Sequence, residues 1–190
     1  MSHDGSRDLE ICGLPVDNVT MEGALDRLEQ RLATRTRTRV FFLNADCVNI
    51  SCRDPEYRRV VQRGDLVFAD GVGMRLAGRL LGTRVRDNVN GTDLFPLACE
   101  RLARSGHRVF LLGARPGVAQ KVQQWAERVF PGLVICGVHH GYFGAEGSAE
   151  VAAEIRRSGA DVLLVALGAP LQEKWIAEHM EATGVTVALG

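Results

Sequence analysis

Short apolar runs that alternate with longer amphipathic segments are the feature that most restricts how this chain can fold. Within each run the hydrophobicity is continuous, which is typical of strands buried on both faces of a parallel sheet. Strand–helix repetition of this kind uses right-handed crossovers and predicts an α/β fold, a doubly wound, mainly parallel sheet in a single domain over residues 1–190. The predicted strands are residues 40–43, 66–69, 109–112, 133–136, 162–166 and 185–188.

Helical spacing and helix-start residues fill the gaps between these runs. Residues 21–32 repeat apolar side chains on one helical face, and Thr20 precedes them as the predicted N-cap. Further predicted starts are Asp54 followed by Pro55, Pro116 in the first turn of a helix that continues to residue 129, Ser148 as a cap, and Pro170.

Composition excludes several classes of protein. The 23 basic and 23 acidic residues cancel, so bulk charge gives no affinity for nucleic acid. No stretch approaches the ~18 consecutive apolar residues of a membrane span, and residues 1–10 lack the apolar core of a signal peptide. Five cysteines, with no CxxC spacing, disfavour both a disulfide framework and a zinc site. We expect a reduced, cytoplasmic protein.

The carboxyl ends of the predicted strands are where an open α/β sheet binds its ligand. Glycine follows most of them, as at Gly71, Gly113 and Gly168, and several of these turns lead into helix N-termini that favour phosphate. Together they predict a nucleotide or diphosphate ligand. The dinucleotide fingerprint is incomplete, because Leu76 replaces its third glycine and no acidic residue closes a second strand, so a dehydrogenase is the weaker alternative.

Asp70 ends a predicted buried strand beside glycines and is the candidate general base, although capping the next helix is an equally simple role. His139 and His140 are adjacent and point to opposite faces of an extended segment, so we expect no metal site there. A basic cluster near Asp70 fits an acceptor pyrophosphate, an anionic membrane surface or a solvated helix face; it comprises Arg75, Arg79, Arg84 and Arg86.

Six sequence blocks together resemble the bacterial WecG/TagA/CpsF glycosyltransferase family. They occur in the family's order and cover the chain from about residue 10 onward. As they stand here they read LNAD at 43–46, ADGVG at 69–73, NGTDL at 90–94, FLLGARPG at 110–117, HHGYF at 139–143 and GAPLQEKW at 168–175.

The resemblance implies a Rossmann-like enzyme that moves an N-acetylhexosamine-type sugar from a UDP donor to a sugar on a polyprenyl diphosphate, at the inner face of the cell membrane. Similar enzymes invert the anomeric centre and use no metal ion or other cofactor. By the same resemblance Asp70 is the base, Asn44 and Gln172 contact sugar, and Tyr142 lies beside the uridine. Gly113 and Gly168 would lie beside the nucleotide, and Asn90 and Asp93 would contact the substrate.

The chain departs from the family pattern in two places. Phe42 stands where a threonine is common, and Asn88 and Asn90 stand in the block where an arginine and a threonine are common. Arg86 is the candidate to replace the missing charge. These changes leave the donor sugar open, and they keep a non-catalytic nucleotide-sugar-binding module as the second hypothesis.

Two further expectations follow from the same resemblance. Similar proteins continue beyond the position of Gly190 with a tail that associates with the membrane and closes the pocket, so we expect peripheral membrane association through a tail that this chain lacks. A homo-oligomer is compatible with the sequence.

Overall fold

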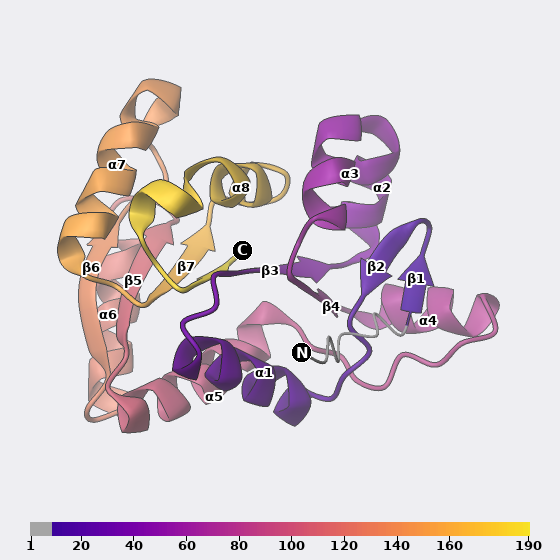
Figure 1. The fold of residues 1–190 in the computed structure, drawn as a ribbon, viewed down its shortest axis with the longest axis horizontal. Coiled ribbons are helices and arrows are strands. Elements are labelled where there is room, and N and C mark those ends of the chain that lie inside the picture. The colour runs from indigo at the N-terminus through magenta and orange to yellow at the C-terminus, as the bar shows by residue number, and fades with distance from the viewer. Residues whose placement is uncertain (1–8) are drawn as a thin grey trace.

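The computed structural model describes residues 9–190, so the expectation about residues 1–10 lies largely outside it. Its centre is a six-stranded sheet in the order β4-β3-β8-β7-β5-β6, in which all strand pairs are parallel. This confirms the predicted doubly wound α/β fold (Figure 1). The strands are β3 (Thr38–Leu43), β4 (Leu66–Ala69), β5 (Arg108–Gly113), β6 (Val134–His139), β7 (Val162–Ala166) and β8 (Val187–Leu189).

All six predicted strands are present. β4 and β7 occupy the predicted residues, whereas β6 runs three residues further than predicted, to His139. A separate two-stranded antiparallel hairpin, β1 (Leu9–Ile11) and β2 (Leu14–Val16), was not predicted. Its turn places Cys12 and Gly13 at φ 54° and 75°, a left-handed pair typical of tight hairpins.

The helices are α1 (Met21–Ala33), α2 (Ala45–Arg53), α3 (Pro55–Gln62), α4 (Val72–Leu80), α5 (Gly91–Ser105), α6 (Val118–Val129), α7 (Gly144–Ser158) and α8 (Leu171–Thr183). Two predicted caps are confirmed. The Thr20 hydroxyl accepts a hydrogen bond from the Gly23 amide at 3.1 Å, and the Asp54 carboxylate accepts one from the Tyr57 amide at 2.9 Å.

Two predicted helix starts are wrong. α7 begins at Gly144, so Ser148 lies inside the helix, where its hydroxyl donates back to the Gly144 carbonyl instead of capping an amide. α6 begins at Val118 after Gly117, whose φ of 84° suits glycine, and this places Pro116 in the turn before the helix.

Both faces of the sheet are covered, which explains the continuous apolar strands. One core cluster joins α1, α5 and α6 to one face, and another joins α7 and α8 to the opposite face. A third packs the β1–β2 hairpin, α2, α3 and α4 around the β3–β4 end (Figure 1). An apolar cavity of about 210 Å³ remains between α1, α5 and the sheet.

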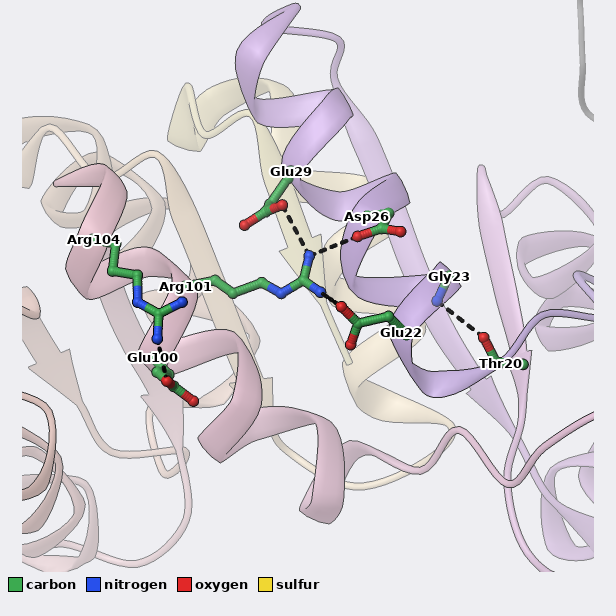
Figure 2. Close-up of polar contacts among 8 residues, drawn as sticks. All are labelled: Thr20, Glu22, Gly23, Asp26, Glu29, Glu100, Arg101 and Arg104. Atoms are coloured by element: carbon green, nitrogen blue, oxygen red, sulfur yellow. Dashed lines mark hydrogen bonds and ion pairs between the residues drawn. The ribbon is translucent and has the colours of Figure 1, made fainter.

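An ion cluster joins α1 to α5. The Arg101 guanidinium on α5 contacts Glu22, Asp26 and Glu29, which lie along one face of α1 (Figure 2). The cluster therefore ties α1 to the C-terminal half of α5.

Candidate active site

A cleft of about 600 Å³ lies at the carboxyl ends of the strands, where the sequence predicted a ligand. Four of the predicted site residues line it together: Asn44, Asp70, Gly113 and Gln172. Its remaining walls include Gly91 and Thr92 from α5 and an apolar surface of which the sequence comparison with the family had indicated only Phe42. That surface comprises Phe42, Phe95, Leu111, Val118, Val122 and Leu164.

Asn44 and Asp70 are brought together by strand pairing. β3 and β4 are parallel neighbours with Leu43 opposite Ala69, so the next residue of each strand emerges at the same edge. The Asn44 Oδ1 accepts a hydrogen bond from the Cys47 amide at 3.0 Å and caps α2. Its side-chain amide also bonds the Asp70 carboxylate. Asn44 is therefore held at its oxygen and presents its NH₂ group to Asp70.

The surroundings of Asp70 raise the pKa of its carboxyl group above the ordinary value. Partial burial raises the pKa of Asp70 above its ordinary value, the hydrogen bond from Asn44 lowers that pKa, and the negative charge of Asp93 raises it again. Asp70 does not cap the following helix, because the N-cap of α4 is Gly71 and no side chain bonds its first amides. The carboxylate of Asp70 is therefore free to face the cleft.

The first turn of α5 forms one lip of the cleft. Asn90 caps the helix by accepting from the Asp93 amide at 2.8 Å, and its own amide donates to the Asp93 carboxylate at 2.6 Å. This pair lies beside the cleft-lining residues Gly91 and Thr92, although neither Asn90 nor Asp93 lines the cleft itself. Asp93 reaches the site through its charge, which acts on Asp70.

Gln172, in the first turn of α8, is fixed at both ends of its amide. Its Oε1 accepts from the Gly168 amide at 3.0 Å, and its Nε2 donates to Glu173 Oε1 at 3.2 Å. Glu173 is 1% exposed, and among the described residues its Oε2 has no hydrogen-bond partner. Burial raises the pKa of Glu173. The GAPLQEKW block contains this glutamate, but its sequence position alone did not reveal its contact with Gln172.

The turn after β5 meets the loop after β6 at the opposite side of the cleft. Gly113 has a φ of 132°, and a Cβ at this position would lie only 2.5 Å from the Ala166 carbonyl carbon, so glycine is required. The Gly141 amide donates to the Ala114 carbonyl at 2.9 Å. This bond brings Tyr142 near the Gly113 turn, but Tyr142 is exposed and does not line the cleft.

Two residues of the segment before α5 lie away from the cleft wall. Arg86 is exposed, and its backbone amide bonds Asn18 at 2.8 Å. Asn88 accepts from the Gly71 amide at 2.5 Å and so braces the turn that follows Asp70. Of the two departures from the family pattern, Phe42 thus changes the cleft wall, whereas Asn88 acts on the backbone behind it.

The histidines and acids form no metal centre in the part of the chain that the structure covers. Within residues 9–190 no three His, Cys, Asp or Glu side chains are grouped in a way that could hold a metal ion. His139 Nδ1 lies 2.7 Å from the His140 carbonyl, and His140 Nδ1 accepts from the Tyr142 amide at 3.2 Å. These contacts give the pair a role in the shape of the loop.

The structure defines an α/β protein with a parallel sheet and, at the carboxyl edge of that sheet, a largely apolar cleft whose lining includes one carboxylate, that of Asp70. The sequence matches the glycosyl transferase WecG/TagA/CpsF family over residues 9–190, and the chain belongs to that family. None of the helices in residues 9–190 has both the length and the apolar character needed to cross a bilayer.

Two similar proteins carry the same name, N-acetylglucosaminyldiphosphoundecaprenol N-acetyl-beta-D-mannosaminyltransferase. The protein from Bacillus spizizenii is 33% identical over 140 residues, which are 73% of this chain and 54% of that protein. The protein from Staphylococcus aureus is 28% identical over 185 residues, 96% of this chain and 72% of that protein. The match to the Bacillus protein thus spans only about half of its length.

Proposed function

We propose that this chain is an inverting, metal-independent glycosyltransferase. It moves an N-acetylhexosamine-type sugar from a UDP donor to a polyprenyl-diphosphate-linked sugar, at the cytoplasmic face of the membrane, in the synthesis of a cell-surface polysaccharide. The names of the two relatives support the acceptor class. The observation that carries the proposal is Asp70, a half-buried carboxylate with a raised pKa, held by Asn44 at the wall of the cleft.

The chemistry needs one base and one stabilised leaving group. Asp70 takes the proton of the acceptor hydroxyl while that oxygen attacks the anomeric carbon, and the bond to the UDP oxygen breaks with its electron pair leaving on the diphosphate. A single displacement inverts the anomeric configuration. A raised pKa makes a carboxylate a better proton acceptor, and partial burial and the negative charge of Asp93 both raise the pKa of Asp70.

The developing charge on the diphosphate needs backbone or cationic partners if no metal ion takes part. The first turn of α6 lines the cleft at Val118 and Ala119, and its N-cap Gly117 provides no side-chain cap. The Val118 amide donates to the Arg115 carbonyl at 3.0 Å, so the Ala119 and Gln120 amides are the ones we assign to phosphate oxygens at the positive end of the helix. The apolar wall formed by Phe95 and Val122 suits the face of a base. We assign the nucleotide to this side and Tyr142 to its outer edge.

The sugar and the acceptor are assigned to the side formed by β3, β4 and α8. Asn44 and Gln172 offer amide groups to hydroxyl or acetamido groups of the substrates, and we assign Asn90 and Asp93, in the first turn of α5 beside the cleft, to the acceptor. Phe42 narrows this side of the cleft with an aromatic ring, so the donor need not be the one named for the relatives. A screen of UDP-N-acetylhexosamines identifies it.

The deciding experiment is Asp70→Asn, assayed in the protein as the organism makes it. We expect kcat to fall by about 10²- to 10⁴-fold, the usual contribution of a general base, with UDP affinity unchanged. Asp46→Asn is the matched control, because Asp46 is exposed on the same side but does not line the cleft. Unchanged transfer by Asp70→Asn removes Asp70 from the mechanism.

Ligand binding separates this proposal from the alternatives. A ligand that binds only the folded state raises the melting temperature. UDP is expected to do so and NAD(H) is not; the reverse result identifies a dehydrogenase. UDP binding without transfer from any UDP-sugar identifies a non-catalytic nucleotide-sugar-binding module.

A further inference from the structure

The outer face of α4 is apolar along its whole length. Val72, Leu76 and Leu80 follow one another at intervals of four residues and are 82%, 57% and 81% exposed. Their spacing places them in one line on the helix. The opposite face holds α4 to the protein through the buried side chain of Met74, which belongs to the core cluster around the β1–β2 hairpin.

The charge of the same segment has one sign only. Residues 72–86 contain four arginines and no acidic residue, in a protein whose total charge is zero. Arg75 and Arg79 each lie three residues after a member of the apolar line, and Arg84 and Arg86 follow on the next segment; all four are exposed. An exposed apolar line flanked by arginines alone is typical of a helix that lies in the interface of an anionic membrane.

A contact between two copies of this chain fits the segment less well. A twofold interface brings the same patch of both copies together, so α4 would face α4 and arginines would meet arginines with no acid to compensate them. An anionic lipid surface has the complementary charge, and its acyl boundary accepts the three apolar side chains.

We propose that α4 is a membrane-docking face. Val72, Leu76 and Leu80 enter the headgroup–acyl boundary of an anionic bilayer, and the adjacent arginines pair with lipid phosphates. The consequence for activity rests on the proposed function. α4 begins two residues after Asp70, so docking brings the candidate base to the bilayer surface, where the diphosphate of a lipid-linked acceptor lies.

Flotation with vesicles of phosphatidylglycerol and phosphatidylcholine, compared with phosphatidylcholine alone, tests the proposal. We expect wild-type protein to float with the anionic vesicles and to be released by high salt. Arg75→Gln/Arg79→Gln is expected to lower the partition coefficient by about thirty-fold, and Leu76→Ser/Leu80→Ser by more than ten-fold.

The matched control is Arg128→Gln/Val129→Ser on α6, which removes one exposed arginine and one exposed apolar side chain elsewhere. It is expected to leave flotation unchanged. Both α4 variants replace exposed side chains, and a melting temperature within about 2 °C of wild type shows that folding is intact. Equal flotation of the wild type, the α4 variants and the control overturns the proposal, as does failure of the wild type to float with anionic vesicles.

Two further measurements distinguish membrane docking from a contact between copies of the chain and from a failure of the proposed function. A change of molecular mass in solution for Leu76→Ser/Leu80→Ser, without a change in flotation, assigns the apolar line to an interface between copies and rejects docking. Transfer to a water-soluble short-chain acceptor is expected to be unchanged in the α4 variants, and transfer to a vesicle-embedded acceptor to fall. If the wild type floats with anionic vesicles but transfers sugar to neither acceptor, the proposed function is wrong while membrane docking still stands.

Discussion

Arg101→Met tests whether the ion cluster between α1 and α5 contributes to stability. The substitution removes the guanidinium but retains an unbranched apolar stem over the cavity that Arg101 helps to line. In the wild type the guanidinium contacts Glu22, Asp26 and Glu29 (Figure 2), with the Asp26 and Glu29 contacts at 2.8 and 2.9 Å. After the substitution, three carboxylates remain along one face of α1 without their shared cation.

The structure sets the size of the expected effect. The three acids are 76%, 64% and 51% exposed, so each pair is an exposed ion pair worth about 0.3–0.5 kcal/mol. Three such pairs amount to about 1–1.5 kcal/mol. For a domain of this size that corresponds to a decrease of about 2–6 °C in melting temperature. Because exposed pairs are screened, most of the difference should disappear in 1 M NaCl.

Urea unfolding followed by circular dichroism measures the difference, and Arg104→Met provides the control. Arg104 lies on the same helix and, within residues 9–190, forms an ion pair with Glu100 alone, one turn away (Figure 2), so its loss is expected to cost no more than about 0.5 kcal/mol. If Arg101→Met and Arg104→Met destabilise the protein equally, the three-acid cluster adds no stability beyond that of a single exposed ion pair. If the loss of unfolding free energy in Arg101→Met is the same at low and high salt, the stabilisation by Arg101 is not electrostatic.

Two further predictions concern titrating groups. Asn44→Ala removes the hydrogen bond that lowers the pKa of Asp70, so the acidic limb of the kcat/KM profile should move to higher pH. Asp93→Asn removes the charge that raises the pKa of Asp70, so the same limb should move to lower pH. Shifts of the two variants in the same direction contradict the assignment of Asp70 as the base. For Glu173, burial raises the pKa in the folded protein above its ordinary value of 4.5, so as pH rises this group loses its proton first in the unfolded state. The free energy of unfolding of the wild type should therefore decrease above about pH 4.5, relative to that of Glu173→Gln. Chemical unfolding between pH 4 and 8 measures this, and the exposed Glu178→Gln should follow the wild type.

The strands were predictable because burial on both faces of the sheet leaves a continuous apolar run in the sequence. Helix starts were predictable where a side chain bonds a free amide, as at Thr20 and Asp54. They were missed where glycine geometry sets the start. α7 follows Phe143, which makes no side-chain cap, and begins at Gly144 with φ 63°, so the sequence pointed instead to the serine four residues later as the cap. The β1–β2 hairpin was missed because its strands have only three residues each.

The site was predictable to the extent that it follows from the ends of strands. Asn44, Asp70 and Gly113 come directly at such ends, and each lines the cleft. Which segments meet beyond those ends depends on the order of the strands, and that order does not appear in the sequence. Arg86 was therefore expected near the substrate, although its side chain is exposed away from the cleft wall.

Strand order also divides the cleft between two parts of the chain. β8 lies between β3 and β7, so the β3–β4 pair contributes Asn44 and Asp70 from one side, while β5 and β7 contribute the turns at Gly113 and Ala166 from the other. If the proposed function is correct, the first part acts on the acceptor hydroxyl and the second binds the nucleotide. Gly113→Ala should then raise the KM for the donor, because its new Cβ displaces the turn, whereas Asp70→Asn should lower kcat. A loss of UDP affinity in Asp70→Asn equal to that in Gly113→Ala would show that catalysis and nucleotide binding are not assigned to separate parts of the cleft.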